Sequence, residues 1–155
     1  MKILLPSIEF KQGIFDIDEF DHSSHNLVIL DDLMDECEKD KTILNLFTTD
    51  SHQKNISVFL ISQNLFSQGK YARTISLNCH YLILLNNPRD RGQIFYLARQ
   101  MYPSLPNYLI ECYEDAVENK QFGYLFIDLK QTTNKKFRVQ TGVLPNEQRI
   151  IYQIK

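Results

Sequence analysis

The stretch that decides the fold is Asn26-Leu-Val-Ile-Leu-Asp-Asp-Leu-Met-Asp-Glu36. Residues 27–30 are four consecutive apolar side chains, and two carboxylates, Asp31 and Asp32, follow at once. A run this short and uniformly apolar predicts a strand buried on both faces, as in a parallel sheet with helices on each side. Ligands of open α/β sheets lie outside the carboxyl ends of the strands. The sequence therefore places two acids where a ligand is expected.

These residues alone leave two interpretations of Asp31 and Asp32 open. In the form of a Walker B segment, the first acid holds Mg²⁺, usually through water, and the second orients or deprotonates the attacking water. In the other interpretation, a buried strand ends in an Asp that caps the next helix. Successive strand residues point to opposite faces, so the two acids need not share a role.

The composition indicates an ordinary globular chain. Its 155 residues suit a single domain, 1–155, with 43% hydrophobic and 23% charged side chains. A formal net charge of -2 gives no global basic field to attract nucleic acid. Cys37, Cys79 and Cys112 form no metal-binding pattern, which predicts reduced thiols in an intracellular protein. No apolar run approaches the roughly 20 residues of a membrane span, so we expect no membrane partner.

Strand and helix patterns alternate along the rest of the chain. This alternation predicts βαβ units and a mainly parallel sheet with flanking helices. Two closing strands joined by a polar link predict a C-terminal β-hairpin, and the tail 144–155 is ambiguous. The predicted strands are 56–61, 81–85, 123–129 and 137–143. The predicted helices are 33–48, 88–101 and 106–118, with a shorter helical piece around 71–75.

Polar side chains also follow the second predicted strand. Ser62-Gln63-Asn64 come directly after Ile61, so the pattern of the first strand repeats. Amides at a strand end are suited to satisfying the backbone of a turn.

Four sequence blocks, in this order, carry a resemblance to a known family. They are Asn26-Leu-Val-Ile-Leu-Asp-Asp-Leu-Met, Leu46-Phe-Thr-Thr-Asp-Ser-His-Gln-Lys-Asn-Ile-Ser-Val, Ser62-Gln-Asn-Leu-Phe and Arg73-Thr-Ile-Ser-Leu-Asn-Cys-His-Tyr, with Asn87-Pro-Arg-Asp after them. They resemble the packaging-type P-loop ATPases of the FtsK–HerA group. The likeness is greatest to the poxvirus-type genome-packaging ATPases of large DNA viruses and Maverick/Polinton transposons, and it spans residues 26–103.

The resemblance implies a P-loop fold and ATP hydrolysis coupled to translocation of double-stranded DNA by a homo-oligomeric ring. It implies that Asp31 holds Mg²⁺ and that Asp32 activates water. Gln63 matches the polar sensor of the γ-phosphate or the lytic water, and Asn64 lies beside it at the nucleotide. Arg73, Arg89 and Arg91 are candidates for an arginine finger acting on a neighbouring subunit, with Arg73 first because its block matches the family best. A solvated helix face is the alternative for each.

The chain departs from this family at the phosphate-binding loop. The motif GxxxxGK[ST] is absent, and the Gly69-Lys70 pair is followed by Tyr71 and lies after the Walker B segment. In the family this loop comes first, and only 26 residues precede Leu27. We therefore expect the C-terminal part of such an ATPase, incomplete at its N-terminus and inactive alone, in the cytoplasm, nucleus or virion.

Two rival functions stay open. One is a non-catalytic remnant or an assembly and interaction module of viral or transposon origin. The other is a response-regulator-like doubly wound domain that uses the acids for Mg²⁺, but that fold needs a Lys after a later strand, and Asn86-Asn87 follow Leu85 instead.

Two local charge clusters complete the candidates. The predicted hairpin link carries cations that suit either DNA phosphates or an ordinary exposed turn. An acidic cluster near the N-terminus lacks the ligand spacing of a Ca²⁺ loop and is expected to be solvated. The cations are Lys130, Lys135, Lys136 and Arg138, and the acids are Asp16, Asp18, Glu19 and Asp21.

Overall fold

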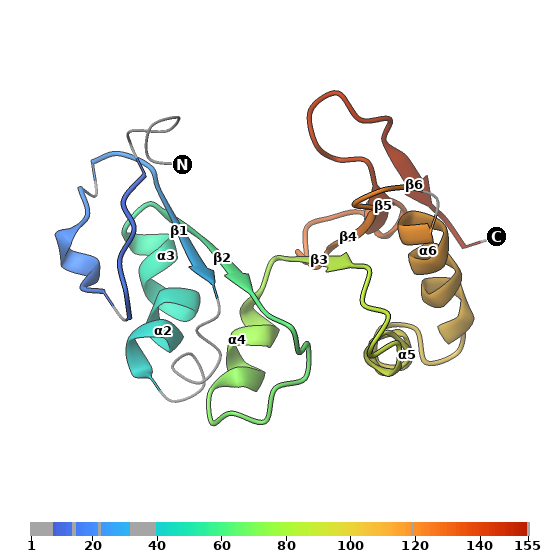
Figure 1. Cartoon of the computed structure of the whole chain (residues 1–155), viewed down its shortest axis with the longest axis horizontal. Helices are drawn as coiled ribbons and strands as arrows, with labels where there is room; N and C mark the ends of the chain where they lie inside the picture. Colours follow the sequence, from blue (N-terminus) through green and yellow to red (C-terminus); the bar gives the residue numbers. More distant parts are fainter. Residues whose placement is uncertain (1–7, 14, 22, 32–39, 119, 155) are drawn as a thin grey trace. The chain divides into compact units, whose positions relative to one another are not determined.

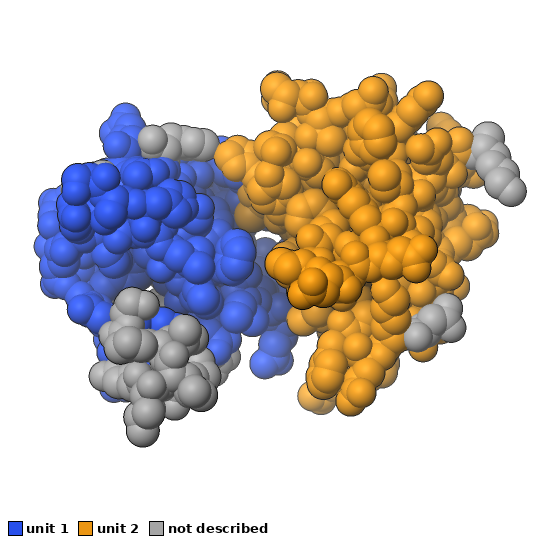
Figure 2. Space-filling model, turned by 90° about the horizontal axis from the view of Figure 1, so that it is seen from above, with its two compact units in different colours: residues 1–78 blue, residues 79–155 orange. Residues whose placement is uncertain are grey.

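A computed structural model describes residues 8–13, 15–21, 23–31, 40–118 and 120–154 (Figure 1). The chain divides into two compact units, which we call unit 1 (Met1–Asn78) and unit 2 (Cys79–Lys155) and which Figure 2 colours separately. Each unit is described by itself, and the single domain stays a prediction. Asp32 and the first part of the helix expected at 33–48 lie outside the described residues.

Unit 1 is built on two parallel strands joined by a helical connection. β1 (Asn26–Asp31) pairs with β2 (Ile56–Ile61) in unbroken register from its first residue to its last. The described part of the connection begins with Asp40, whose carboxylate accepts a hydrogen bond from the Thr42 N–H at 2.6 Å and caps the first helix. The remaining elements are α2 (Lys41–Asn45), the π-helical η2 (Leu46–Asp50), α3 (Ser51–Gln53), α4 (Ala72–Asn78) and the 3₁₀ turn η1 (Ile17–Glu19).

One face of the β1–β2 sheet forms the core of unit 1. Val28 and Leu30 of β1 and Ile56 of β2 are buried on this face, against side chains from α2, η2 and α4. The helical connection extends to Gln53, past the predicted end at Thr48, because the chain continues through η2 without a break. The buried cluster comprises Ile17, Val28, Leu30, Ile43, Leu46, Ile56 and Ile75.

The opposite face of this sheet is apolar and open. Leu27, Ile29, Phe59 and Ile61 are 54%, 55%, 54% and 52% exposed, although the sequence predicts burial on both faces. Strand alternation places these four side chains together, because Ile29 pairs with Phe59 and Leu27 and Ile61 lie two residues away along the strands. We call Leu27, Ile29, Phe59 and Ile61 the open face.

Unit 2 is an antiparallel sheet with two helices in the connection between its first two strands. The strand order is β3-β4-β5-β6, and every neighbouring pair is antiparallel. Two successive helices between β3 and β4 return the chain to the end at which β3 finishes, so β4 runs back along it. The elements are β3 (Tyr81–Leu85), α5 (Gly92–Met101), α6 (Pro106–Glu118), β4 (Tyr124–Asp128), η3 (Lys135–Phe137), β5 (Val139–Thr141) and β6 (Ile150–Tyr152).

Two tyrosine hydroxyls of α6 tie this helix to the sheet. The Tyr113 hydroxyl donates to the Leu85 carbonyl oxygen at 3.0 Å and accepts from the Asn87 N–H at 3.2 Å. The Tyr108 hydroxyl donates to the Tyr152 carbonyl oxygen at 2.9 Å, and desolvation raises its pKa above the ordinary value. These bonds fix α6 to the end of β3 and to β6.

The α/β class and the C-terminal hairpin of β4 and β5 are confirmed. Parallel pairing is seen for β1 and β2, whereas β3 to β6 are antiparallel, so a mainly parallel sheet of the P-loop kind stays a prediction. The helix predicted from Pro88 begins instead at Gly92, because the Asn87 side chain accepts from the Arg89 N–H and holds a turn there. None of the described helices is long and apolar enough to cross a membrane.

Candidate functional site

The carboxyl ends of β1 and β2 form the candidate site. Parallel pairing brings Asp31 opposite Ile61, the last residue of β2, so Asp31 and residues 62–64 lie at the same edge of the sheet. We call Asp31 together with Ser62, Gln63 and Asn64 the edge site. This placement follows from the in-register parallel ladder, which brings the carboxyl ends of both strands to one edge.

Asp31 is the carboxylate of this edge in the described part of the chain. Its side chain is exposed and lies on the same face of β1 as Leu27 and Ile29. Because Asp31 is exposed, a cation in solvent can reach its carboxylate. Asp32, predicted to activate water, lies outside the described residues.

The two amide side chains after β2 differ in their hydrogen bonds. The Asn64 carboxamide oxygen accepts from the Phe66 N–H at 2.9 Å, and the Ser62 hydroxyl bonds the Asn64 N–H and carbonyl oxygen at 3.1 and 2.7 Å. Asn64 therefore acts as the turn-satisfying amide, which was the alternative to its nucleotide role. Gln63 is exposed, and no described group holds its side chain by a hydrogen bond.

The candidate cations differ in their surroundings. Arg73, the second residue of α4, is exposed. Exposure fits both an arginine that reaches a neighbouring subunit and one on a solvated helix face, so it does not decide between them. Arg91 instead forms ion pairs with Glu118 at 3.3 Å and with Glu114 at 3.9 Å. The Lys70 ammonium lies 4.9 Å from the centre of the Tyr71 ring.

The edge site fits a cation better than it fits a whole nucleotide. Mg²⁺ is often held by one or two carboxylates, with water and substrate phosphates completing its shell, and Asp31 is an exposed carboxylate at this edge. In the described part of the chain, no group of three or more His, Cys, Asp and Glu side chains could hold a metal ion without such additions. The phosphates would also need backbone N–H donors and a Lys, which the sequence lacks in GxxxxGK[ST] form.

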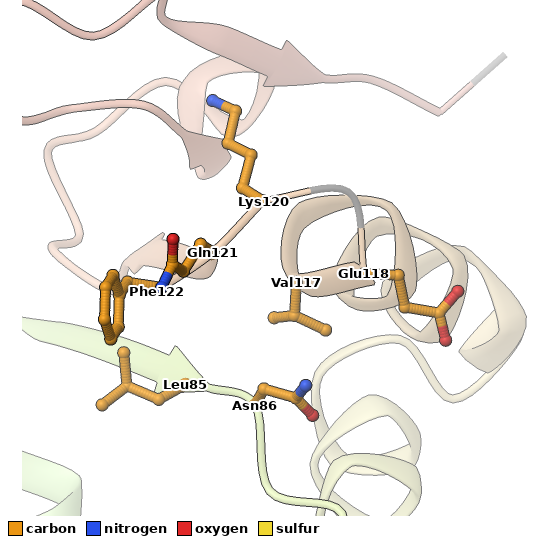
Figure 3. Close-up of a pocket in the computed structure, with 8 residues that line it drawn as sticks. Leu85, Asn86, Val117, Glu118, Lys120, Gln121 and Phe122 are labelled. Carbon is orange, nitrogen blue, oxygen red and sulfur yellow. The ribbon is translucent and has the colours of Figure 1, made fainter.

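A separate pocket of about 740 Å³ lies in unit 2 (Figure 3). It is bounded by the end of β3, the end of α6 and the turn before β4, and Lys120 points away from the other lining side chains in the figure. Phe122 of this turn is 86% exposed and has a φ of 62°, a left-handed conformation that is rare for a bulky residue. Within the described ranges, none of the predicted site residues lines this pocket, and no sequence pattern indicated it.

The open face beside Asp31 is the other feature that sequence reasoning missed. An uninterrupted apolar run has no alternation, so it carries no sign of which face would stay uncovered.

Comparisons of the chain with protein-family models, with curated proteins and with solved structures find no match.

Proposed function

We propose that this chain derives from the DNA-packaging ATPases of the FtsK–HerA group and that its edge site is the cation-binding part of a Mg²⁺–nucleotide site. In this proposal Asp31 holds Mg²⁺, and Gln63 faces the phosphate or the water. Asp32 stays the proposed water-activating acid. Arg73 stays the proposed arginine finger, which acts at the site of a neighbouring subunit. Double-stranded DNA, a ring of copies and a P-loop-like parallel sheet belong to the same proposal.

One observation carries this proposal. Asp31 ends β1, and Gln63 lies two residues beyond the end of the adjacent parallel strand β2, with its side chain held by no described hydrogen bond. This is where open α/β sheets bind ligands, and phosphoryl transfer depends mainly on positioning and on neutralising charge. The lack of a phosphate-binding motif predicts weak nucleotide affinity for the chain alone, because that motif supplies the N–H cradle and the Lys that hold the phosphates.

Titration calorimetry with ATP, in the presence and absence of Mg²⁺, tests the proposal. We expect Mg²⁺-dependent binding with a dissociation constant of roughly a millimolar, which corresponds to about 4 kcal/mol. The substitution Asp31→Asn should abolish the Mg²⁺-dependent part. Asp90→Asn removes an exposed carboxylate of unit 2 and should leave the binding unchanged. Equal heats from Asp31→Asn and the unsubstituted chain, or no heat at all, would refute the nucleotide role.

A second function, a non-catalytic assembly module, is favoured by the open face. Four large apolar side chains, each more than half exposed, lie together on one sheet, and patches of this kind mark interaction sites. We propose a second copy of this chain as the occupant, since a net charge of -2 opposes self-association only weakly. Calorimetry without nucleotide binding would leave this as the function of the β1–β2 sheet.

A further inference from the structure

The loop between β4 and β5, residues 129–138, has an excess of positive charge. It carries four cations and no acid, although the chain as a whole has a net charge of -2. We call residues 129–138 the basic loop. Its cations are Lys130, Lys135, Lys136 and Arg138.

Of these four cations, Lys130 forms an ion pair with an acid in the described part of the chain. Its ammonium donates to the Tyr81 hydroxyl at 2.6 Å, lies 3.8 Å from the Asp128 carboxylate and sits 4.8 Å from the centre of the Tyr81 ring. The Asp128 carboxylate also accepts from the Lys130 N–H at 3.0 Å. Lys130 and Asp128 therefore balance each other at the base of the loop.

Arg138 is a partly buried guanidinium that lacks a carboxylate partner within ion-pair distance among the described residues. Its Nε atom is buried without a hydrogen-bond partner, and a terminal nitrogen makes only a long contact of 3.5 Å to the Lys130 carbonyl oxygen. Arg138 therefore adds a positive charge that pairs with no carboxylate among the described residues, on a side chain that solvent partly reaches.

Lys135 and Lys136 extend this charge to the surface. Both belong to η3, both are exposed, and neither takes part in an ion pair within the described ranges. The Asn134 side chain accepts from the Lys136 N–H at 3.0 Å and so fixes the start of η3. Two adjacent surface lysines on an ordered turn, with Arg138 three residues beyond Lys135, suit a chain of phosphate groups.

An exposed aromatic ring distinguishes which phosphate-bearing partner fits. Phe137 is 46% exposed and stands between Lys136 and Arg138, with the exposed polar side chains Gln131 and Asn134 in the same loop. Cations beside an exposed ring are the combination on which single-stranded nucleic acids bind, with phosphates at the cations and a base stacked on the ring. A duplex keeps its bases stacked on one another, so none is available to stack on Phe137. A single aromatic side chain buries too little apolar area to anchor the loop in a membrane surface.

We infer that the basic loop binds single-stranded nucleic acid, with Lys135, Lys136 and Arg138 at the phosphates and Phe137 stacked on a base. This inference does not rest on the edge site, because all of its residues belong to unit 2. It also differs from the double-stranded DNA of the proposed function.

Fluorescence anisotropy with a labelled oligothymidine strand tests the inference on the full chain. We expect salt-dependent binding whose logarithmic slope is roughly -2 for three phosphate contacts. The pair Lys135→Gln with Lys136→Gln should reduce that slope by about 1.4. Phe137→Leu, which keeps an apolar side chain but removes the ring, should weaken binding roughly tenfold. The control pair Lys41→Gln with Lys120→Gln removes the same charge from exposed sites outside the loop and should bind normally.

Several results would overturn the inference. They are an absence of binding at low salt, equal losses in the control pair, full binding by Phe137→Leu, and binding of a duplex or of anionic vesicles as tight as that of the single strand. Asp31→Asn should bind the strand normally, so failure of the edge site and failure of the basic loop are distinguishable. Amide exchange in unit 2 checks that the variants remain folded.

Discussion

Replacing Leu30 by alanine is expected to destabilise unit 1 by about 3 kcal/mol, because the side chain lies in a closely packed core that relaxes only partly around a cavity. Leu30 is 2% exposed and belongs to the cluster between β1 and its helices. Leu27, three residues earlier on the same strand, is 54% exposed on the open face. Leu27→Ala should change the stability by less than about 0.5 kcal/mol.

Native-state hydrogen exchange measures the stability change that each of these two substitutions causes, separately for unit 1 and unit 2. In Leu30→Ala, exchange of the best-protected β1 and β2 amides should accelerate roughly a hundredfold, and amides of unit 2 serve as the internal reference. A loss of protection in Leu27→Ala as large as that in Leu30→Ala would mean that the open face is covered in solution. That result would favour the assembly module with a second copy on this face.

A second large loss is expected from Gly142→Ala, which should destabilise unit 2 by about 3 kcal/mol. Gly142 follows β5 and has a φ of +66°, a left-handed conformation that costs an L-residue energy. An added Cβ would also overlap the Gln148 carbonyl oxygen and lie 2.8 Å from the Gln148 carbonyl carbon. These are backbone atoms, so no side chain can rotate away.

The matched control for Gly142→Ala is Gly13→Ala. Gly13 has a similar φ of +78°, but nothing lies within 4 Å of an added Cβ, so this variant carries only the backbone cost of about 1 kcal/mol. Thermal unfolding followed by NMR signals of each unit should show unit 2 of Gly142→Ala melting more than about 10 °C lower. Equal shifts of the melting temperature in the two variants would show that the backbone between β5 and β6 moves to accommodate the added methyl group.

The sequence predicted the strands better than it predicted their pairing. The helix at 106–118 matches α6 at both ends, and the apolar runs at 56–61 and 81–85 match β2 and β3. An apolar run does not tell which neighbour it pairs with, and the two consecutive helices α5 and α6 reverse the direction of β4. The three-residue β6 stayed hidden in the tail because it is too short for a periodic pattern.

The site was predictable only where it depends on strand ends. Adjacent carboxyl ends follow from parallel pairing, so the proximity of Asp31 and residues 62–64 could be derived. The different surroundings of Gln63 and Asn64 could not be derived, because they depend on which amide bonds the backbone of the turn. The Phe66 N–H donates to the Asn64 side chain. The sequence could not predict that Arg138 pairs with no described carboxylate either, since ion pairing depends on which acids the fold brings within reach.

The most direct test of the edge site is a titration with Mn²⁺, which substitutes for Mg²⁺ and broadens the NMR signals of nearby amides. Broadening should begin at Asp31 and at residues 61–64 and should be absent in Asp31→Asn. The rival acidic cluster at residues 16–21 offers an internal comparison, since Asp18 there is already paired with Lys54 at 2.6 Å. Broadening that starts at residues 16–21, or that persists at β1 and β2 in Asp31→Asn, would contradict the assignment of the cation to the edge site.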